Sequence, residues 1–340
     1  MAQQTKGKTV VFAGNLIADH IKTVAFYPEK NMCAPVLAIE TAVGGSVCNT
    51  AIDLKVIDPT FTVKAIGLVG NDGDGSFLTD ALVRYGVDVS GVSKTELAGT
   101  SCSDVMTEQE SGERTFFSYK GAGSYFNEES LPKDLACDYF HLGYLLFLDA
   151  LDAADETYGT KAAKMLCNLQ KKGIKTSVDV LSETGNRYVS VVRPALRYTD
   201  YCIINETEGG NVAEISAREN GKLSLKNLEA IAHKLMSFGV KEKVVIHAPE
   251  VGVALDKSGA FTVVPSLTLP KGYVVGTVGA GDAFCAGYIA AHLNGKSDEE
   301  ALAFASLSAA ANLSAKDSVS GMRSAAEIEK LEIFGRRNLC

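Results

Sequence analysis

The chain has 340 residues, of which 46% are hydrophobic and 22% are charged, and its formal net charge is −8. These values are typical of a globular protein with a large core, and the lack of a dense Lys/Arg block argues against a nucleic-acid partner. The eight cysteines form no Cys-x-x-Cys pair, which argues against a zinc site or a redox dithiol and favours reduced thiols in the core of a cytoplasmic protein.

The first predicted strand is a continuous apolar run at residues 10–13, which ends at Gly14. Such a run is typical of a strand buried in a parallel sheet. Asp19 follows shortly after it, in the region where α/β sheets bind ligands beyond their strand ends. A solvated turn is the alternative for this residue.

No apolar stretch of the chain has the length of a signal peptide or a membrane span, so we expect neither.

Two segments have the pattern of strands that stand apart from a main sheet. Residues 23–43 hold β-forming residues without helical periodicity, and residues 100–107 and 114–119 flank a polar, glycine-containing loop, which is a hairpin signal. We predict that these segments form a small sheet. Phe116 and Phe117 would give it an apolar surface that packs on a partner or folds over a ligand. Because exposed sheet edges seek partners, we expect a homodimer formed through this sheet.

A double glycine, Gly44-Gly45, precedes a segment with helical character that contains Asn49. Glycines lack a Cβ, so a substrate can pack closely against their backbone. The Asn49 amide can then hold a hydroxyl group. This turn is therefore a candidate substrate site.

Strands and helices alternate along the rest of the chain, a rhythm that predicts an α/β fold with a doubly wound, mostly parallel sheet. The predicted strands are residues 61–70, 138–143, 175–180, 201–204 and 244–247, with 251–255 and 261–264 as an antiparallel pair. The predicted helices are residues 76–85, 160–172, 225–238, 283–293 and 299–314.

Polar residues follow the predicted strand 201–204 directly, with Asn205 first and Glu208 three residues later. Amide and carboxylate groups at a strand's carboxyl end suit a hydrated Mg²⁺ ion, which keeps most of its waters and uses few protein ligands. A helix-capping box is the alternative for this pair of residues.

The most informative stretch is residues 276–284, at the predicted start of a helix. Backbone N–H groups at Gly279, Ala280 and Gly281 can converge there on an anion, since a helix N-terminus has free donors and a positive dipole end. Asp282 stands beside them, and we expect the dipole to keep it ionised. An anion site next to a base is what phosphoryl transfer to a hydroxyl requires. The alternative is that Asp282 only caps the helix.

A nicotinamide-dependent oxidoreductase is disfavoured, because Phe284 stands where the dinucleotide fingerprint needs its third glycine.

In three motifs the chain resembles the ribokinase-like (PfkB) carbohydrate kinases, over essentially its whole length. The family's Asp-Thr-x-Gly-Ala-Gly-Asp is similar to residues 276–282, its Gly-Gly-x-x-x-Asn to residues 44–49, and its Asn-x-x-Glu to residues 205–208. The resemblance implies a doubly wound α/β domain with a small β-sheet lid. The main domain would comprise residues 1–22, 45–99 and 121–340, and the lid residues 23–44 and 100–120.

By position, the resemblance also implies roles for single residues. Asp282 would be the catalytic base, and the amides at Gly279, Ala280 and Gly281 would form the anion hole for the transferred phosphoryl group. The remaining candidates are Asp19, Gly44, Gly45 and Asn49 for the substrate, Asn205, Glu208, Thr277 and Gly252 for the nucleotide, and Asn205 and Glu208 for Mg²⁺ through water. The implied cofactors are ATP and Mg²⁺.

Two departures from the family pattern limit this transfer. Gly276 replaces an aspartate that often helps to hold a monovalent cation, so the need for K⁺ stays open. The nucleotide-side glycine pattern survives at residues 247–252 only in Gly252.

The sequence therefore predicts an ATP-dependent kinase that phosphorylates a hydroxymethyl group of a small sugar, such as ribose, fructose or a related derivative. Two alternatives stay open. One is a nucleoside kinase of the same family, with an adenosine-like acceptor. The other is a protein on the same fold that binds sugars or nucleosides without turnover.

Overall fold

A nine-stranded sheet forms the centre of the computed structural model, which describes residues 7–339. Its strand order is β17-β16-β15-β12-β11-β8-β1-β4-β5. The strands from β15 to β5 run parallel, whereas β16 pairs antiparallel with both β15 and β17. The strands are β1 (Thr9–Gly14), β4 (Thr62–Gly70), β5 (Asp88–Thr95), β8 (Tyr139–Leu145), β11 (Lys175–Val180), β12 (Tyr201–Asn205), β15 (Lys243–His247), β16 (Val251–Asp256) and β17 (Phe261–Pro265). The predicted doubly wound sheet is confirmed.

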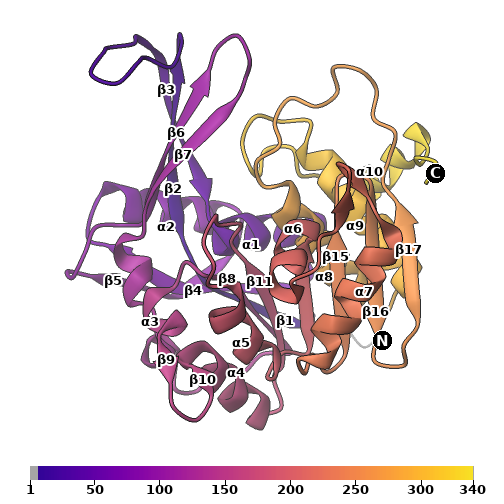
Figure 1. The fold of residues 1–340 in the computed structure, drawn as a ribbon. Coiled ribbons are helices and arrows are strands. Elements are labelled where there is room, and N and C mark those ends of the chain that lie inside the picture. Colours follow the sequence, from indigo (N-terminus) through magenta and orange to yellow (C-terminus); the bar gives the residue numbers. More distant parts are fainter. Residues whose placement is uncertain (1–6, 340) are drawn as a thin grey trace, which may run out of the picture.

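Helices cover both faces of this sheet and bury two separate cores against it (Figure 1). One face packs against α1 (Ser46–Ile57), α2 (Gly73–Arg84), α8 (Ala280–Leu293) and α9 (Asp298–Asn312). The other face packs against α4 (Lys161–Lys171), α5 (Arg193–Leu196), α6 (Glu206–Ala213) and α7 (Leu225–Ser237). The shorter elements are α3 (Asp149–Asp152), α10 (Ala325–Glu329), the strand pairs β9 (Ala154–Asp155) with β10 (Gly159–Thr160) and β13 (Arg218–Glu219) with β14 (Lys222–Leu223), 3-10 helices at Gly121–Tyr125, Glu128–Ser130 and Lys330–Phe334, and a π-helix at Tyr188–Val192.

A second sheet of four strands rises from one side of the main domain (Figure 1). Its order is β3-β2-β6-β7, from the strands β2 (Ile17–Val24), β3 (Val36–Gly44), β6 (Cys102–Glu108) and β7 (Arg114–Tyr119). The predicted boundary at residue 23 is too late. Residues 17–22, which we assigned to the main domain, already pair with β3 and β6, because only Asn15 and Leu16 separate β1 from β2.

The cysteines only partly follow the expected pattern. Cys48, Cys167, Cys202 and Cys285 are buried free thiols, as predicted, but Cys33 is exposed on the loop between β2 and β3. Along residues 7–339, no helix combines the length and the apolar character needed to cross a membrane.

Candidate active site

The glycine turn before α8 places Asp282 inside the first turn of the helix. Gly279 is the N-cap residue and has a φ of 79°, a left-handed conformation that favours glycine. A Cβ atom at this position would lie 2.6 Å from Cβ of Ser318, so there is also no room for a larger residue. Asp282 is the third residue of α8 and is 5% exposed. The alternative that it caps the helix is therefore wrong.

Two side chains from distant elements hold the Asp282 carboxylate. The Asn49 amide in α1 donates a hydrogen bond to Oδ2 at 2.8 Å, and the Tyr144 hydroxyl in β8 donates to Oδ1 and Oδ2 at 2.8 and 2.9 Å. Asn49 is itself oriented by the Ser318 hydroxyl, which lies 2.9 Å from its Oδ1. Asn49 was predicted from the sequence, whereas Tyr144 was not. The available signal was a hydroxyl-bearing side chain next to the carboxyl end of a buried strand.

The environment of Asp282 raises its pKa above the ordinary value, mainly because burial disfavours the charged form. The hydrogen bonds from Asn49 and Tyr144 act in the opposite direction. The expectation that the helix dipole dominates and keeps Asp282 ionised is thus not supported. A raised pKa makes this carboxylate a stronger base, which suits removal of a hydroxyl proton.

Asp19 lies on the small sheet and faces the same region. It is 9% exposed and sits against the backbone of Gly44, where a Cβ atom would lie 2.5 Å from its Oδ2. Gly45 has a φ of 80°, so the turn into α1 depends on glycine. Burial, and then the neighbouring Asp282, raise the pKa of Asp19 to about 7. The solvated-turn alternative for Asp19 is wrong. The structure brings the predicted substrate residues to one side of Asp282.

The space on this acceptor side is nearly closed. A cavity of about 10 Å³ remains between the inner face of the small sheet and the loop after α9, which is room for no more than one water. Arg114 of β7 crosses this gap and donates a hydrogen bond to the Lys316 carbonyl at 3.1 Å. The cavity is lined by Asp19, Ile21, Ala42, Val105, Arg114, Phe116, Val278, Lys316, Asp317 and Ser318. The cavity is therefore too small for a ligand larger than one water.

On the other side of Asp282, Asn205 and Glu208 form the predicted capping box of α6. The Asn205 side chain accepts hydrogen bonds from the backbone N–H groups of Thr207 and Glu208, and Glu208 accepts one from the Asn205 backbone. The capping alternative is therefore correct, yet the same residues also line a cavity of about 210 Å³ that reaches Asp282 and the turn at Gly279, Ala280 and Gly281.

Asp179 of β11 joins this cavity, although the sequence analysis did not select it. Its pKa lies well above the ordinary value because of burial and then the nearby Glu208 and Asp282, and the pKa of Glu208 is raised to about 7. Buried carboxylates that disfavour each other's charge create a place for a cation. Residues 7–339 contain no group of three or more histidine, cysteine or carboxylate side chains that could hold a metal ion, so the residues of this cavity fit only a hydrated Mg²⁺ that retains most of its waters. The signal for Asp179 was a carboxylate at the end of a predicted parallel strand.

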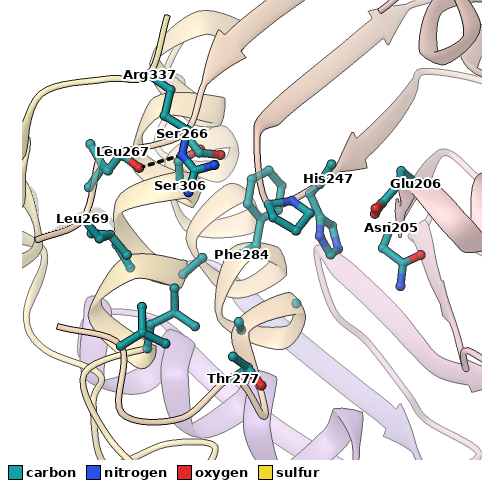
Figure 2. A pocket seen from close by; sticks show the side chains of 18 of the residues that line it. Asn205, Glu206, His247, Ser266, Leu267, Leu269, Thr277, Phe284, Ser306 and Arg337 are labelled. Atoms are coloured by element: carbon teal, nitrogen blue, oxygen red, sulfur yellow. Dashed lines mark hydrogen bonds between the residues drawn. The ribbon is translucent and has the colours of Figure 1, made fainter. Parts of the chain in front are cut away.

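A larger pocket of about 690 Å³ opens from this cavity, and both contain Asn205, His247, Thr277, Ala280 and Gly281 (Figure 2). Its walls are largely apolar, and it has the size of a site for a nucleotide-sized ligand. Further lining residues are Leu267, Leu269, Pro270, Val274, Phe284 and Leu313.

Two positions singled out by the sequence lie differently from the family pattern. Gly252 is buried in β16 beneath Phe284, where a Cβ atom would lie 3.1 Å from Cζ, and it does not line the large pocket. At Gly276 a Cβ atom would lie 2.6 Å from the Ala315 carbonyl oxygen. A carboxylate side chain therefore does not fit at residue 276, and the residues present do not reproduce the family's cation-holding aspartate.

The two sheets and the glycine turn with its carboxylate define the class of this protein, a ribokinase-like α/β fold. The chain belongs to the pfkB family of carbohydrate kinases, whose model matches residues 8–325. It is accordingly a phosphotransferase that acts on a hydroxyl group, within a family of sugar and nucleoside kinases.

The similarity to known proteins extends over most of the chain. Ribokinase of Schizosaccharomyces pombe is 25% identical over 85% of this chain and 86% of its own length. Adenosine kinase of Schizophyllum commune is 25% identical over 74% of either chain. In fold, the chain is similar to Arabidopsis thaliana ribokinase complexed with ribose and ATP, with a TM-score of 0.76, 20% identity, and coverage of 96% of this chain and 98% of that one.

Proposed function

We propose that the chain transfers the γ-phosphate of ATP to a hydroxymethyl group of a small sugar, with Asp282 as the general base. The observation that carries this proposal is the position of Asp282. Its buried carboxylate lines the cavity of about 210 Å³ that opens into the large pocket, and it also lies next to Asp19 and Asn49. A phosphoryl donor and a hydroxyl acceptor can therefore meet at a single carboxylate.

In the proposed reaction, Asp19 and Asn49 bind hydroxyls of the sugar and orient its hydroxymethyl group toward Asp282. The proton of that group passes to Asp282 while its oxygen attacks the γ-phosphorus of ATP. Backbone N–H groups at the start of α8 stabilise negative charge on the transferred group. Mg²⁺ held near Asn205, Glu208 and Asp179 would neutralise phosphate charge. The products are the sugar phosphate and ADP.

An acceptor screen tests this function. Release of ADP is measured with ATP and Mg²⁺ over ribose, fructose, keto-deoxy sugar acids and nucleosides, and the product is identified by mass spectrometry. We expect ADP release that depends on a sugar and a product heavier by one phosphoryl group. Binding of a sugar without ADP release, for every acceptor tested, would instead support the non-catalytic alternative.

A nucleoside acceptor is the second candidate. The similarity to adenosine kinase favours it, as does Phe116, an aromatic side chain that lines the acceptor cavity and could stack on a base. The same screen distinguishes the two, because a nucleoside kinase would phosphorylate adenosine with a higher kcat/KM than any free sugar.

We also propose that two copies pair through the outer face of the small sheet, in the cytoplasm. Ile39, Phe117 and Tyr119 lie on the face opposite to Asp19 and are 69%, 60% and 51% exposed. Apolar groups at this density on one exposed sheet favour an interface.

Light scattering at micromolar concentration tests the dimer. We expect twice the chain mass for the wild type and the single mass for Phe117→Glu. Leu97→Glu is the control, since Leu97 is at least as exposed as Phe117 but lies outside the small sheet. A wild-type protein with the mass of one chain contradicts the dimer.

A further inference from the structure

Two polar side chains, Ser306 and Arg337, stand at the end of the large pocket that lies away from Asp282. Figure 2 shows both at the opposite end of the pocket from Thr277, which marks the side of the polar cavity. The apolar walls between the two ends include Leu267 and Phe284. If the phosphates of the donor nucleotide lie beside Asp282, as the proposed function requires, its base reaches Ser306 and Arg337.

Ser306 lines this end of the pocket and carries a buried, unsatisfied hydroxyl. It belongs to α9 and is 6% exposed, and among residues 7–339 its Oγ atom has no hydrogen-bond partner. A buried hydroxyl without a partner is costly, so groups of this kind usually bind something. Because Ser306 lines the pocket while its Oγ atom is buried, a rotation of the side chain would bring this hydroxyl to a bound ligand.

Arg337 comes from the C-terminal tail, beyond residue 325, where the match to the family model ends. The tail is fixed to the segment after β17: the Arg337 backbone N–H donates to the Ser266 carbonyl at 2.9 Å, and its Nε donates to the Leu267 carbonyl at 3.2 Å. Arg336 strengthens this contact through a hydrogen bond to the Pro265 carbonyl at 2.8 Å. The tail of this chain therefore adds a guanidinium to a pocket otherwise built by the family core.

Both terminal nitrogens of Arg337 remain available to a ligand. Within the described part of the chain, neither is hydrogen-bonded and Arg337 has no ion pair. The neighbouring Glu250 is already bound by both terminal nitrogens of Arg218, at 2.8 and 3.0 Å. Glu206, which lines the pocket, is likewise paired with Arg218 at 2.9 Å. Hydrogen bonds from Arg218, and also the charge of Arg337, lower the pKa of Glu250. Glu250 and Glu206 are thus both already hydrogen-bonded to Arg218.

The hydrogen-bonding capacity of Arg337 and Ser306 determines which nucleotide bases they can bind. A guanidinium only donates hydrogen bonds, and its planar fork matches two adjacent acceptors. Guanine offers such a pair in O6 and N7, whereas adenine offers N7 beside an amino donor. A serine hydroxyl both donates and accepts, so Ser306 fits either purine. We propose that Arg337 and Ser306 bind the purine base of the donor nucleotide and that the protein uses GTP as well as ATP.

Binding of nucleoside diphosphates tests this inference without knowledge of the acceptor. Isothermal titration of the full-length protein in Mg²⁺ buffer should give Kd values for GDP and ADP within about threefold of each other, and values for CDP and UDP about tenfold higher. Binding of GDP more than about 100-fold weaker than that of ADP overturns the inference, as does failure of both purine diphosphates to bind.

Substitutions assign the effect to the two residues. Arg337→Ala should weaken GDP binding about tenfold and ADP binding less than about threefold, and Arg337→Lys should restore only part of the loss, because lysine lacks the fork. Ser306→Ala should weaken both by a few-fold. Lys330→Ala removes an exposed cation from the same C-terminal region and serves as the control. If Arg337→Ala binds GDP like the control, the role of Arg337 is refuted.

Turnover separates this inference from the proposed function on which it rests. Sugar phosphorylation by ATP, combined with no binding of GDP, refutes the base preference and leaves the sugar kinase intact. Comparable binding of GDP and ADP that responds to Arg337→Ala, combined with no turnover of any acceptor, supports the base site and refutes the sugar kinase.

Discussion

The two sides of Asp282 differ in how completely they are formed. The proposed nucleotide side consists of cavities of about 210 and 690 Å³, built from strand ends of the main sheet and from α6, α8 and α9. The acceptor side retains about 10 Å³, between the small sheet and the loop after α9. One half of the site is therefore open on a rigid scaffold, whereas the other is closed by an element that covers it.

Burial explains this difference. The main sheet is packed on both faces by helices, which holds the carboxyl ends of its strands in place. The small sheet has many exposed residues, and the hydrogen bonds that join it to the main domain include Arg114 to the Lys316 carbonyl, the Ser318 hydroxyl to the Val43 carbonyl, and His20 with Asp74. We therefore expect nucleotide binding to need little rearrangement and acceptor binding to need opening of the small sheet.

The largest effect is expected at the group that both sides share. Asp282→Asn removes the base and should lower kcat by about 10²–10⁴-fold, because proton transfer typically contributes that much. Binding of ATP and of the sugar should change only a few-fold. Steady-state kinetics and titration of each ligand measure the two effects. A turnover near that of the wild type would exclude Asp282 as the base.

A change confined to the nucleotide side comes next. Glu208→Gln removes one of the buried carboxylates that fit Mg²⁺, and we expect kcat/KM for the nucleotide to fall by about 10–100-fold with a higher Mg²⁺ requirement. Affinity for the sugar should stay unchanged. A Mg²⁺ titration of activity checks this, with the exposed Glu219→Gln as control. An equal loss of sugar affinity would mean that the two sides are not separate.

Asp19→Asn alters only the acceptor side and should raise KM for the sugar by about tenfold, since a charged hydrogen-bond acceptor is lost.

Asp19→Asn should also change the free energy of unfolding in a pH-dependent manner. The folded-state pKa of Asp19 is about 7, against an ordinary value of 3.8. The folded protein thus holds the proton more tightly, and the wild type loses stability as pH rises from about 4 to 7.

The stability difference between Asp19→Asn and the wild type should therefore favour the variant at pH 8, by as much as about 4 kcal/mol, and shrink toward pH 4. Thermal unfolding at both pH values measures it. A difference in Tm that is the same at pH 8 and at pH 4.5 would show that Asp19 is not a buried, proton-binding carboxylate.

The smallest effect is expected at Tyr144, which orients the base from the main sheet. Tyr144→Phe removes a hydrogen bond that lowers the pKa of Asp282, so that pKa should rise. Because the base works when deprotonated, the acid limb of the kcat–pH profile should move to higher pH, and kcat at pH 7 should fall by a few-fold. Tyr125→Phe, at an exposed tyrosine, is the control. An unshifted profile would reduce Tyr144 to a packing role.

Much of this site could be predicted because its signals are local. Gly44-Gly45 and Gly279–Gly281 mark turns that the backbone requires, and Asp19, Asn49, Asn205 and Asp282 stand at fixed distances from predicted strands and helix starts. The carboxyl ends of neighbouring parallel strands meet at one edge of the sheet, so these short motifs converge.

Other parts depend on contacts that no local pattern encodes. Tyr144 reaches Asp282 across 138 positions of sequence, and Arg337 reaches its pocket only because the tail pairs with the segment after β17. The start of the small sheet at Ile17 was missed because its pairing with β6 joins residues more than 80 positions apart. The edge strand β5 was missed because its residues are half-exposed and polar, without an apolar run.

The most direct test of the account is the fate of the γ-phosphate in a single turnover, followed by ³¹P NMR in wild type and Asp282→Asn with ATP, Mg²⁺ and the best acceptor of the screen. The account predicts that the wild type moves the phosphate to the hydroxymethyl oxygen of a sugar, and that the variant binds both substrates but transfers phosphate at least about 100-fold more slowly. Transfer to water alone in the wild type, or equal rates in the two proteins, would contradict it.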